Sequence, residues 1–185
     1  MKIPVASALR LPLRPGREYE SRFDREQSTL KMLAIPIASI MFCSMMTTLP
    51  ILLAEPLLPP LGLMMMLAWR LMRPGLLPMW AGLPFGLYDD IFSGQPFGSA
   101  GLIWSLVMIV IEMIDARAIW RDHFQDWLIA SVLIAAALFI GLFLAGLAHA
   151  APEPLVLLPQ ILMSILLYPL VVRLCARLDR WRLAT

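Results

Sequence analysis

The chain has 185 residues, of which 60% are hydrophobic and 15% are charged, and its formal net charge is +2. Its mean hydropathy of +0.78 is far above that of ordinary soluble domains, so the composition excludes a soluble globular protein and indicates an integral membrane protein. Because a helix that spans a bilayer takes about 20 residues, one bundle of helices accounts for the whole length.

Uncharged apolar segments recur along the chain, and each can form a helix with a rise of about 1.5 Å per residue. We predict six membrane spans, at residues 32–54, 57–69, 75–92, 98–114, 127–148 and 155–172. The second span is short and begins near Pro59-Pro60, and the third carries two carboxylates near its end. The expected fold is therefore an all-α integral membrane protein, a bundle of six transmembrane helices.

The placement of lysine and arginine supports this count, because these residues mark the cytoplasmic side of a membrane protein. With six spans and both termini in the cytoplasm, all 15 basic residues fall on one side, whereas five or seven spans would break the segregation. The prediction divides the chain into a basic cytoplasmic tail (1–31), a six-helix membrane domain (32–175) and a second basic cytoplasmic tail (176–185).

The first tail mixes its arginines with acidic residues and contains no short apolar core followed by a small-residue cleavage site. We therefore expect it to be a tail and not a cleavable signal peptide, with arginines that set the topology and contact anionic lipid headgroups. Docking of a specific protein on this tail is the alternative.

Cysteine and histidine residues give no sign of a metal or cofactor site. Cys43 lies in the middle of a span and Cys175 at the end of another, so no disulfide is expected. His123 and His149 fall in loops on opposite sides, and no Cys/His cluster has ligand spacing. The methionine run 64–66 is better explained as adaptable packing in a helix interface. We expect no metal, no cofactor and no nucleic-acid partner.

The two carboxylates of the third span differ in the face they occupy. Gly82, Gly86 and Asp90 recur at every fourth residue and share one face, while Asp89 is turned by about 100°. Counted from Pro74 as continuous helix, Asp90 lies about 24 Å along the span, near the outer boundary of the membrane core. Small residues at this spacing let another helix approach closely. Asp90 is thus expected in a tight helix contact, and Asp89 nearer to headgroups or water.

The chain must turn directly after Asp90. Ser93, Gly94 and Pro96 are typical turn residues, and Gly98-Ser99 begins the next helix with small side chains. Ser93 or Ser99 could cap that helix start. A carboxylate one turn earlier is well placed to accept hydrogen bonds from the same backbone donors, and the helix dipole favours its charge. We interpret Asp90 as a structural clamp that closes this corner.

Two functional alternatives compete with the clamp. Adjacent carboxylates in a span suggest an intramembrane aspartyl protease, but that chemistry needs a second carboxylate at the same depth on another helix. The other acid near a span, Glu112, lies at the opposite membrane face, so no catalytic residue is expected. Solute binding at the outer corner stays open, although the outer loops offer few polar groups.

Residues 59–98 carry a resemblance to a known family. Pro59 opens the second span, Trp69 follows ten residues on and Pro74 five residues later, and a G-x-x-x-D-x-x-S-G-x-x-x-G pattern begins at Gly86 and ends at Gly98. This spacing resembles that of the rod-shape-determining protein MreD family. The chain departs from the family pattern by Pro60, where the family has a polar residue, and by the additional Asp89.

The resemblance implies a non-enzymatic subunit of the bacterial cell-elongation machinery in the inner membrane. Such subunits pair with the bitopic protein MreC, and through it with MreB filaments and with the glycan polymerase and transpeptidase of the side wall. The family is also similar to the six-helix substrate-binding subunits of energy-coupling-factor vitamin transporters, which makes solute binding the alternative function. We hypothesise that the stripe of Gly82 and Gly86, closed by Asp90, shapes the bundle that receives a partner's membrane helix. Self-association of two copies is left open.

Overall fold

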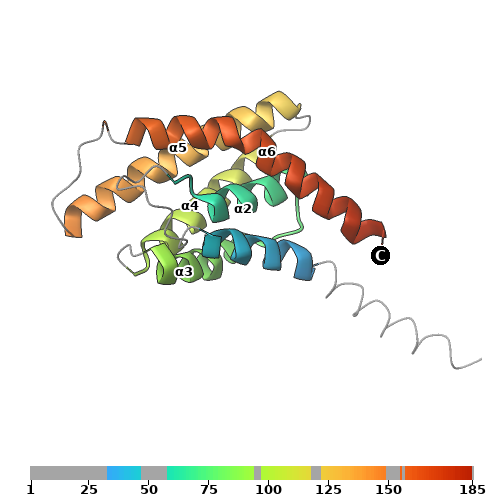
Figure 1. Ribbon diagram of the computed structural model, residues 1–185, viewed down its shortest axis with the longest axis horizontal. Helices are drawn as coiled ribbons and strands as arrows, with labels where there is room; N and C mark the ends of the chain where they lie inside the picture. The colour runs from blue at the N-terminus through green and yellow to red at the C-terminus, as the bar shows by residue number, and fades with distance from the viewer. Residues whose placement is uncertain are drawn as a thin grey trace, which may run out of the picture.

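A computed structural model describes residues 33–46, 58–93, 97–117, 122–148, 155 and 157–184. All regular structure in these residues is helical, so the predicted all-α fold is confirmed for the part of the chain that is described. The predicted tail 1–31 lies outside it. Figure 1 shows the helices packed side by side as one bundle.

The α-helices follow the order of the predicted spans. The first described helix is Leu33–Met46. The later elements are α2 (Leu61–Met72), the 3-10 helix η1 (Met79–Ala81), α3 (Gly82–Ser93), α4 (Ser99–Asp115), α5 (His123–Ala148) and α6 (Leu157–Ala184).

The helices differ in whether they are long enough to cross a membrane. Among the described residues, two helices have the length and apolar composition to do so, His123–Leu147 and Leu157–Leu183. Helix α2 has 12 residues, which corresponds to about 18 Å against a hydrocarbon core of about 30 Å. The composition indicates a membrane protein, but six complete crossings stay a prediction.

The third predicted span is not one continuous helix. Residues 73–78 form a turn, in which Gly75 adopts a left-handed φ of 87°, and α3 begins only at Gly82. Pro74 and Pro78 explain the break, because proline cannot donate a backbone hydrogen bond and disfavours helix at the residue before it. Counting Asp90 as about 24 Å along a helix from Pro74 was therefore wrong. The helical rise from Gly82 to Asp90 is about 12 Å.

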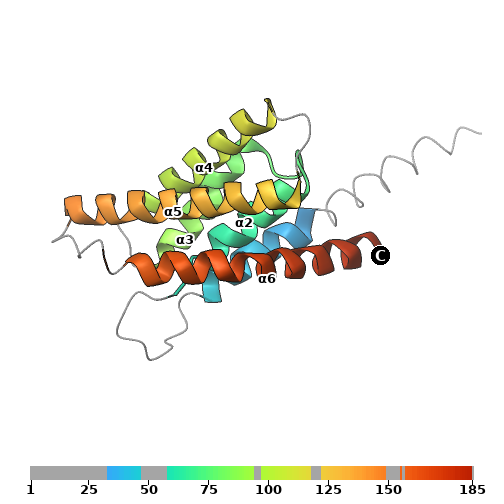
Figure 2. The same ribbon diagram turned by 90° about the horizontal axis from the view of Figure 1, so that it is seen from above.

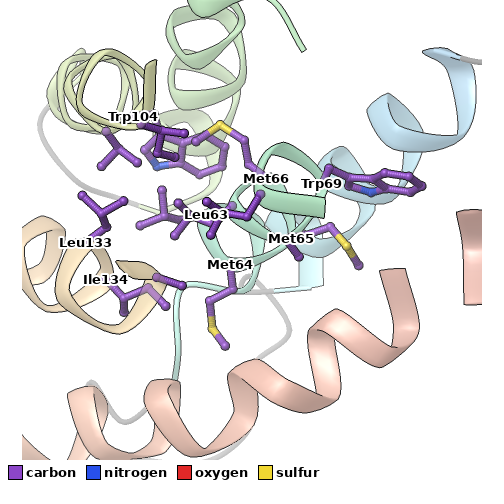
Figure 3. Packing of buried hydrophobic residues seen from close by; sticks show 14 of the residues in the cluster. Leu63, Met64, Met65, Met66, Trp69, Trp104, Leu133 and Ile134 are labelled. Atoms are coloured by element: carbon purple, nitrogen blue, oxygen red, sulfur yellow. The ribbon is translucent and has the colours of Figure 1, made fainter. Parts of the chain in front are cut away.

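Helix α2 lies in the middle of the bundle in both views (Figures 1 and 2). Ten of its 12 residues, from Gly62 to Leu71, are buried. Figure 3 shows Met64, Met65 and Met66 leaving α2 in different directions, with Trp104 of α4 and two side chains of α5 among their neighbours in the cluster. The methionines are thus packing residues, as predicted. Lipid is itself apolar, so such a core is held mainly by close van der Waals packing.

Helix α6 extends beyond its predicted end. It continues through the predicted tail 176–185 as far as Ala184, so the basic residues of that tail are helical. They lie on the same helix that packs against α2 and α5. The division between membrane domain and tail at residue 175 stays a prediction.

We expect Gly62→Ala to destabilise the bundle and Gly141→Ala to be tolerated. A Cβ atom at Gly62 would lie 3.0 Å from the ring of Trp104 and 3.2 Å from Cβ of the buried Ser44, whereas at Gly141 it would meet only Ile103, at 3.7 Å. Overpacking of this kind costs about 1–3 kcal/mol. Thermal unfolding in detergent, followed by size-exclusion chromatography, measures the difference. Equal midpoints for the two variants would contradict the tight contact at Gly62.

Candidate functional site

The carboxylate of Asp90 meets the first turn of α4. It accepts hydrogen bonds from the backbone N–H groups of Gly98 (2.9 Å), Ala100 (2.9 Å) and Gly101 (3.3 Å), and from the hydroxyl of Ser99 (3.2 Å). The side chain is buried, with the residue 4% exposed. The hydrogen bonds expected between this carboxylate and the start of the next helix are therefore present.

Asp90 supplies the cap that α4 lacks. The N-terminal N–H groups of a helix have no partner within it, and the N-cap residue of α4, Gly98, has a left-handed φ of 97° and no side chain that could cap. The alternative caps proposed from sequence do not act in this way: Ser99 donates its hydroxyl to Asp90, and Ser93 is exposed. The negative charge also lies at the positive end of the α4 dipole. Gly94 lies outside the described residues.

The glycines of α3 allow its backbone to touch that of α4. A Cβ atom at Gly86 would lie 2.5 Å from the carbonyl oxygen of Ala100, and one at Gly82 would lie 2.6 Å from that of Trp104. Real Cβ contacts are never so short, so any larger residue would push the helices apart. The glycine stripe is therefore a seam inside this chain. A partner helix could use the hairpin that the stripe builds, but not the stripe itself.

The three other residues of the family pattern lie near the two ends of α2. Pro59 is buried just before α2, and its carbonyl accepts the N–H of Leu61 at 2.8 Å. Trp69 is fully buried near the opposite end, where its indole N–H donates to the hydroxyl of Ser39 at 2.9 Å. Pro74 is exposed in the following turn. The residues of the family pattern thus do not form one site. One group lies at the Asp90 corner, and a separate region surrounds Trp69.

A cavity of about 350 Å³ opens beside the Asp90 corner. Its polar lining comes from Asp89, Ser93, Ser99 and Gln160, and α5 supplies much of the apolar wall. Asp89 is half-buried, and its carboxyl interacts with the hydroxyl of Ser44 in the first described helix. The expectation that Asp89 lies nearer to headgroups or water than Asp90 stays a prediction, and its side chain faces a cavity that sequence reasoning did not foresee.

Sequence reasoning missed Gln160 as a member of this cavity. Its amide N–H donates to the carbonyl of Leu58 at 2.7 Å, which joins the start of α6 to the segment before α2. The available signal was a single amide in an otherwise apolar span, because polar side chains inside a membrane segment usually face protein.

A second group that sequence reasoning missed is a set of ion pairs where α2, α4 and α6 end. Arg70 is buried and pairs with Glu112 and, at 3.2 Å, with Asp115. Asp179 of α6 joins two more arginines, Arg73 at 2.8 Å and Arg182 at 2.7 Å, and the Arg182 guanidinium lies 5.5 Å from the ring centroid of Trp69. The placement of arginines in the sequence predicts only the side of the membrane on which they lie. The signal was the matching acids Glu112 and Asp115, three residues apart near the end of α4.

The positions of the acids do not form a proteolytic dyad. Asp90 contacts the first turn of α4, whereas Glu112 lies near its other end and pairs with Arg70. Residues 100 and 112 are separated along the helix by about 18 Å. The two carboxylates therefore cannot share a proton as an aspartyl dyad requires. No cluster of three metal-ligating side chains occurs in the part of the chain that the structure describes.

The sequence model of one family, described as rod shape-determining protein MreD, matches residues 26–178. The chain belongs to the MreD family. The match confirms the resemblance seen in residues 59–98 and extends it from the end of the first tail to the last turns of α6. It makes the chain a membrane protein of the rod-shape-determining system. No curated protein and no solved structure matches the chain, so the likeness to vitamin-transporter subunits is not shown.

We expect Asp90→Ala to lower the thermal unfolding midpoint well below that of Ser99→Ala. Removing the carboxylate leaves three backbone N–H groups and one hydroxyl without their acceptor, and each buried unsatisfied donor costs about 1–3 kcal/mol. Ser99→Ala removes one of these contacts and leaves the acceptor in place. The measurement is thermal unfolding of both purified variants in the same detergent. If the two midpoints agree, Asp90 does not cap α4.

Arg70→Leu is expected to destabilise the protein, whereas Arg117→Leu is not. Arg70 is buried, and its loss removes the ion pairs with both Glu112 and Asp115, and the breaking of a buried ion pair strongly destabilises folded proteins. Arg117 is exposed in the turn after α4. Both variants lose one positive charge from the same end, so a purely topological role would affect them equally. Accumulation in membranes and thermal unfolding distinguish the two roles.

Proposed function

We propose that this MreD-family chain is a non-enzymatic scaffold subunit of the rod machinery, a multi-pass protein of the bacterial inner membrane that pairs with MreC. Through MreC it links MreB filaments to the glycan polymerase and transpeptidase that build the side wall. The observation that carries this proposal is the α3–α4 hairpin that Asp90 closes. Asp90 and both glycines of the seam make packing contacts within the chain, as expected for a scaffold. The family pattern is thus concentrated on a structural element.

The α3–α4 hairpin has an apolar hollow on its surface, which suits a single membrane helix. The hollow measures about 510 Å³ and is lined by leucines and an isoleucine around three small residues, Gly98, Gly101 and Ser105. Small residues let a second helix approach closely. The Ser105 hydroxyl already donates to the carbonyl of Gly101 at 2.7 Å, so the hollow presents little polarity. We assign it to the membrane helix of MreC.

Filling this hollow should weaken the pairing with MreC. Leu106 lines the hollow and is 43% exposed, while Leu166 of α6 is 75% exposed and outside it. We expect Leu106→Trp to reduce the amount of MreC that co-purifies with the tagged chain by about tenfold, the loss that about 1.4 kcal/mol of binding free energy gives. Leu166→Trp is the matched control and should pair as the unmodified chain does.

The same variants test the function in cells. Depletion of the protein should make rod-shaped cells round, and Leu166→Trp should restore the rod shape whereas Leu106→Trp should not. Gly86→Leu and Asp90→Ala probe the hairpin itself. Undiminished pairing in all of these variants, with normal insertion and accumulation, would rule out the hairpin as the docking element.

The alternative function is the substrate-binding membrane subunit of a vitamin or small-solute transporter. The cavity beside Asp89 favours it, because polar groups from three helices converge there. The two functions differ in the phenotype of depletion: rounding of the cells supports the scaffold, and vitamin auxotrophy without rounding supports the transporter.

The two tails complete the proposal. We place the basic segment 1–31 in the cytoplasm against anionic headgroups, and with it the arginine-rich end of α6 beyond residue 175. Both segments would then lie on the same side as the ion pairs of Arg70 and Arg73, in agreement with the positive-inside rule.

A further inference from the structure

We infer that the cavity beside Asp89 binds a protonated amine attached to an apolar body. The carboxylate of Asp89 lines the cavity together with Ser99 and Gln160, and aromatic and aliphatic side chains form the rest of the wall. This inference goes beyond the scaffold function and does not depend on the pairing with MreC.

The cavity has the composition of a ligand site. Its volume of about 350 Å³ lies within the range of roughly 300–1,000 Å³ typical of small-molecule sites, which are mostly apolar with a few polar groups that fix orientation. Asp89 comes from α3, Ser99 from the adjacent α4 and Gln160 from α6, so polar residues of three helices line one space. A simple packing defect between helices is lined by apolar side chains.

The charge of the cavity selects for a cation. Asp90, next in the chain, is satisfied by four donors, whereas the contact found for Asp89 in the described residues is one hydroxyl, that of Ser44. The ion-paired arginines lie where α2, α4 and α6 end, away from this cavity. A carboxylate without a cationic partner in a low-dielectric site is costly, and an ammonium group would offset that cost. Two adjacent carboxylates also disfavour an anionic ligand.

The remaining wall selects for an apolar body. Phe92, Trp104 and Leu142 face the cavity, and Gly141 and Ala145 of α5 leave room between them. A ligand that places its ammonium at Asp89 would therefore lay hydrocarbon or an aromatic ring against α4 and α5. Two sources share this chemistry: the ethanolamine headgroup of a membrane phospholipid, and a free amine that enters from the aqueous side.

The test uses the full-length chain and separates the two sources. In one arm, the protein is released from nanodiscs that contain equal amounts of phosphatidylethanolamine and phosphatidylglycerol, and native mass spectrometry reports the lipid retained. In the other arm, nanodiscs contain phosphatidylglycerol alone, and 4-phenylbutylamine is titrated against 4-phenylbutyrate and 4-phenylbutanol with thermal unfolding as the readout.

Three variants make the outcome specific. Asp89→Asn removes the charge and keeps the shape of the side chain. Asp122→Asn removes one exposed negative charge from the start of α5, outside the cavity. Gly141→Leu fills the cavity and leaves Asp89 in place, so it provides a second test if Asp89→Asn does not accumulate.

In at least one arm, we expect the ligand that carries the amine to bind about tenfold more tightly than the comparison ligands of that arm. This factor is the loss of affinity expected when a hydrogen bond to a charged group is removed. Asp89→Asn and Gly141→Leu should abolish this preference, and Asp122→Asn should retain it.

Retention of phosphatidylethanolamine identifies the lipid as the source, and stabilisation by 4-phenylbutylamine alone identifies a free amine. No preference for the amine in either arm, or a preference unchanged by Asp89→Asn and Gly141→Leu, would overturn the inference. MreC pairing is measured separately, so the failure of one proposal is distinguishable from that of the other.

Discussion

Asp90 lets two helices meet backbone to backbone, because its carboxylate satisfies donors that the left-handed Gly98 leaves uncapped. A side-chain cap within α4 would add bulk at the point where α3 approaches most closely. Because α3 supplies the cap, the first turn of α4 (residues 98–101) can consist of small residues and pack directly against Gly86. The seam and the hydrogen bonds therefore stabilise each other, since each brings the two helices to the distance that the other needs.

The position of this hairpin gives the bundle two chemically different ends. The buried helix α2 runs from the cavity, which Pro59 and Pro60 line, to the ion pairs of Arg70. All the acid at the cavity end is carried by Asp89 and Asp90 within the described residues, while arginines and acids alternate at the other end. A short, apolar and nearly fully buried helix can join such ends because methionine side chains adapt to irregular neighbours.

The Asp90 corner could be predicted from sequence because it depends on local spacing. Helical phase places Gly82, Gly86 and Asp90 on one face, and the turn residues that follow bring the next helix start within reach. The surroundings of Asp89 could not be predicted in this way, because they depend on where Ser44 and α6 pack. The burial of Arg70 was missed for the same reason: the positive-inside rule assigns a side of the membrane and does not say whether a charge points into the bundle. Pro74 and Pro78 were a signal for the break in the sequence. The segment was nevertheless interpreted as one span because its hydropathy is high throughout.

The first turn of α4 forms a shared wall between the two surfaces of the hairpin. Ser99 and Ala100 line the cavity, while Gly98 and Gly101 line the apolar hollow. All four residues contribute a donor or a hydroxyl to the carboxylate of Asp90. A displacement of this turn would therefore change both surfaces together and would also disturb the cap. Any ligand that favoured one position of the turn would alter the affinity of a helix in the hollow, and by linkage that helix would alter the affinity of the ligand by the same factor. Asp90 restrains this coupling, because moving the turn means breaking several hydrogen bonds at once.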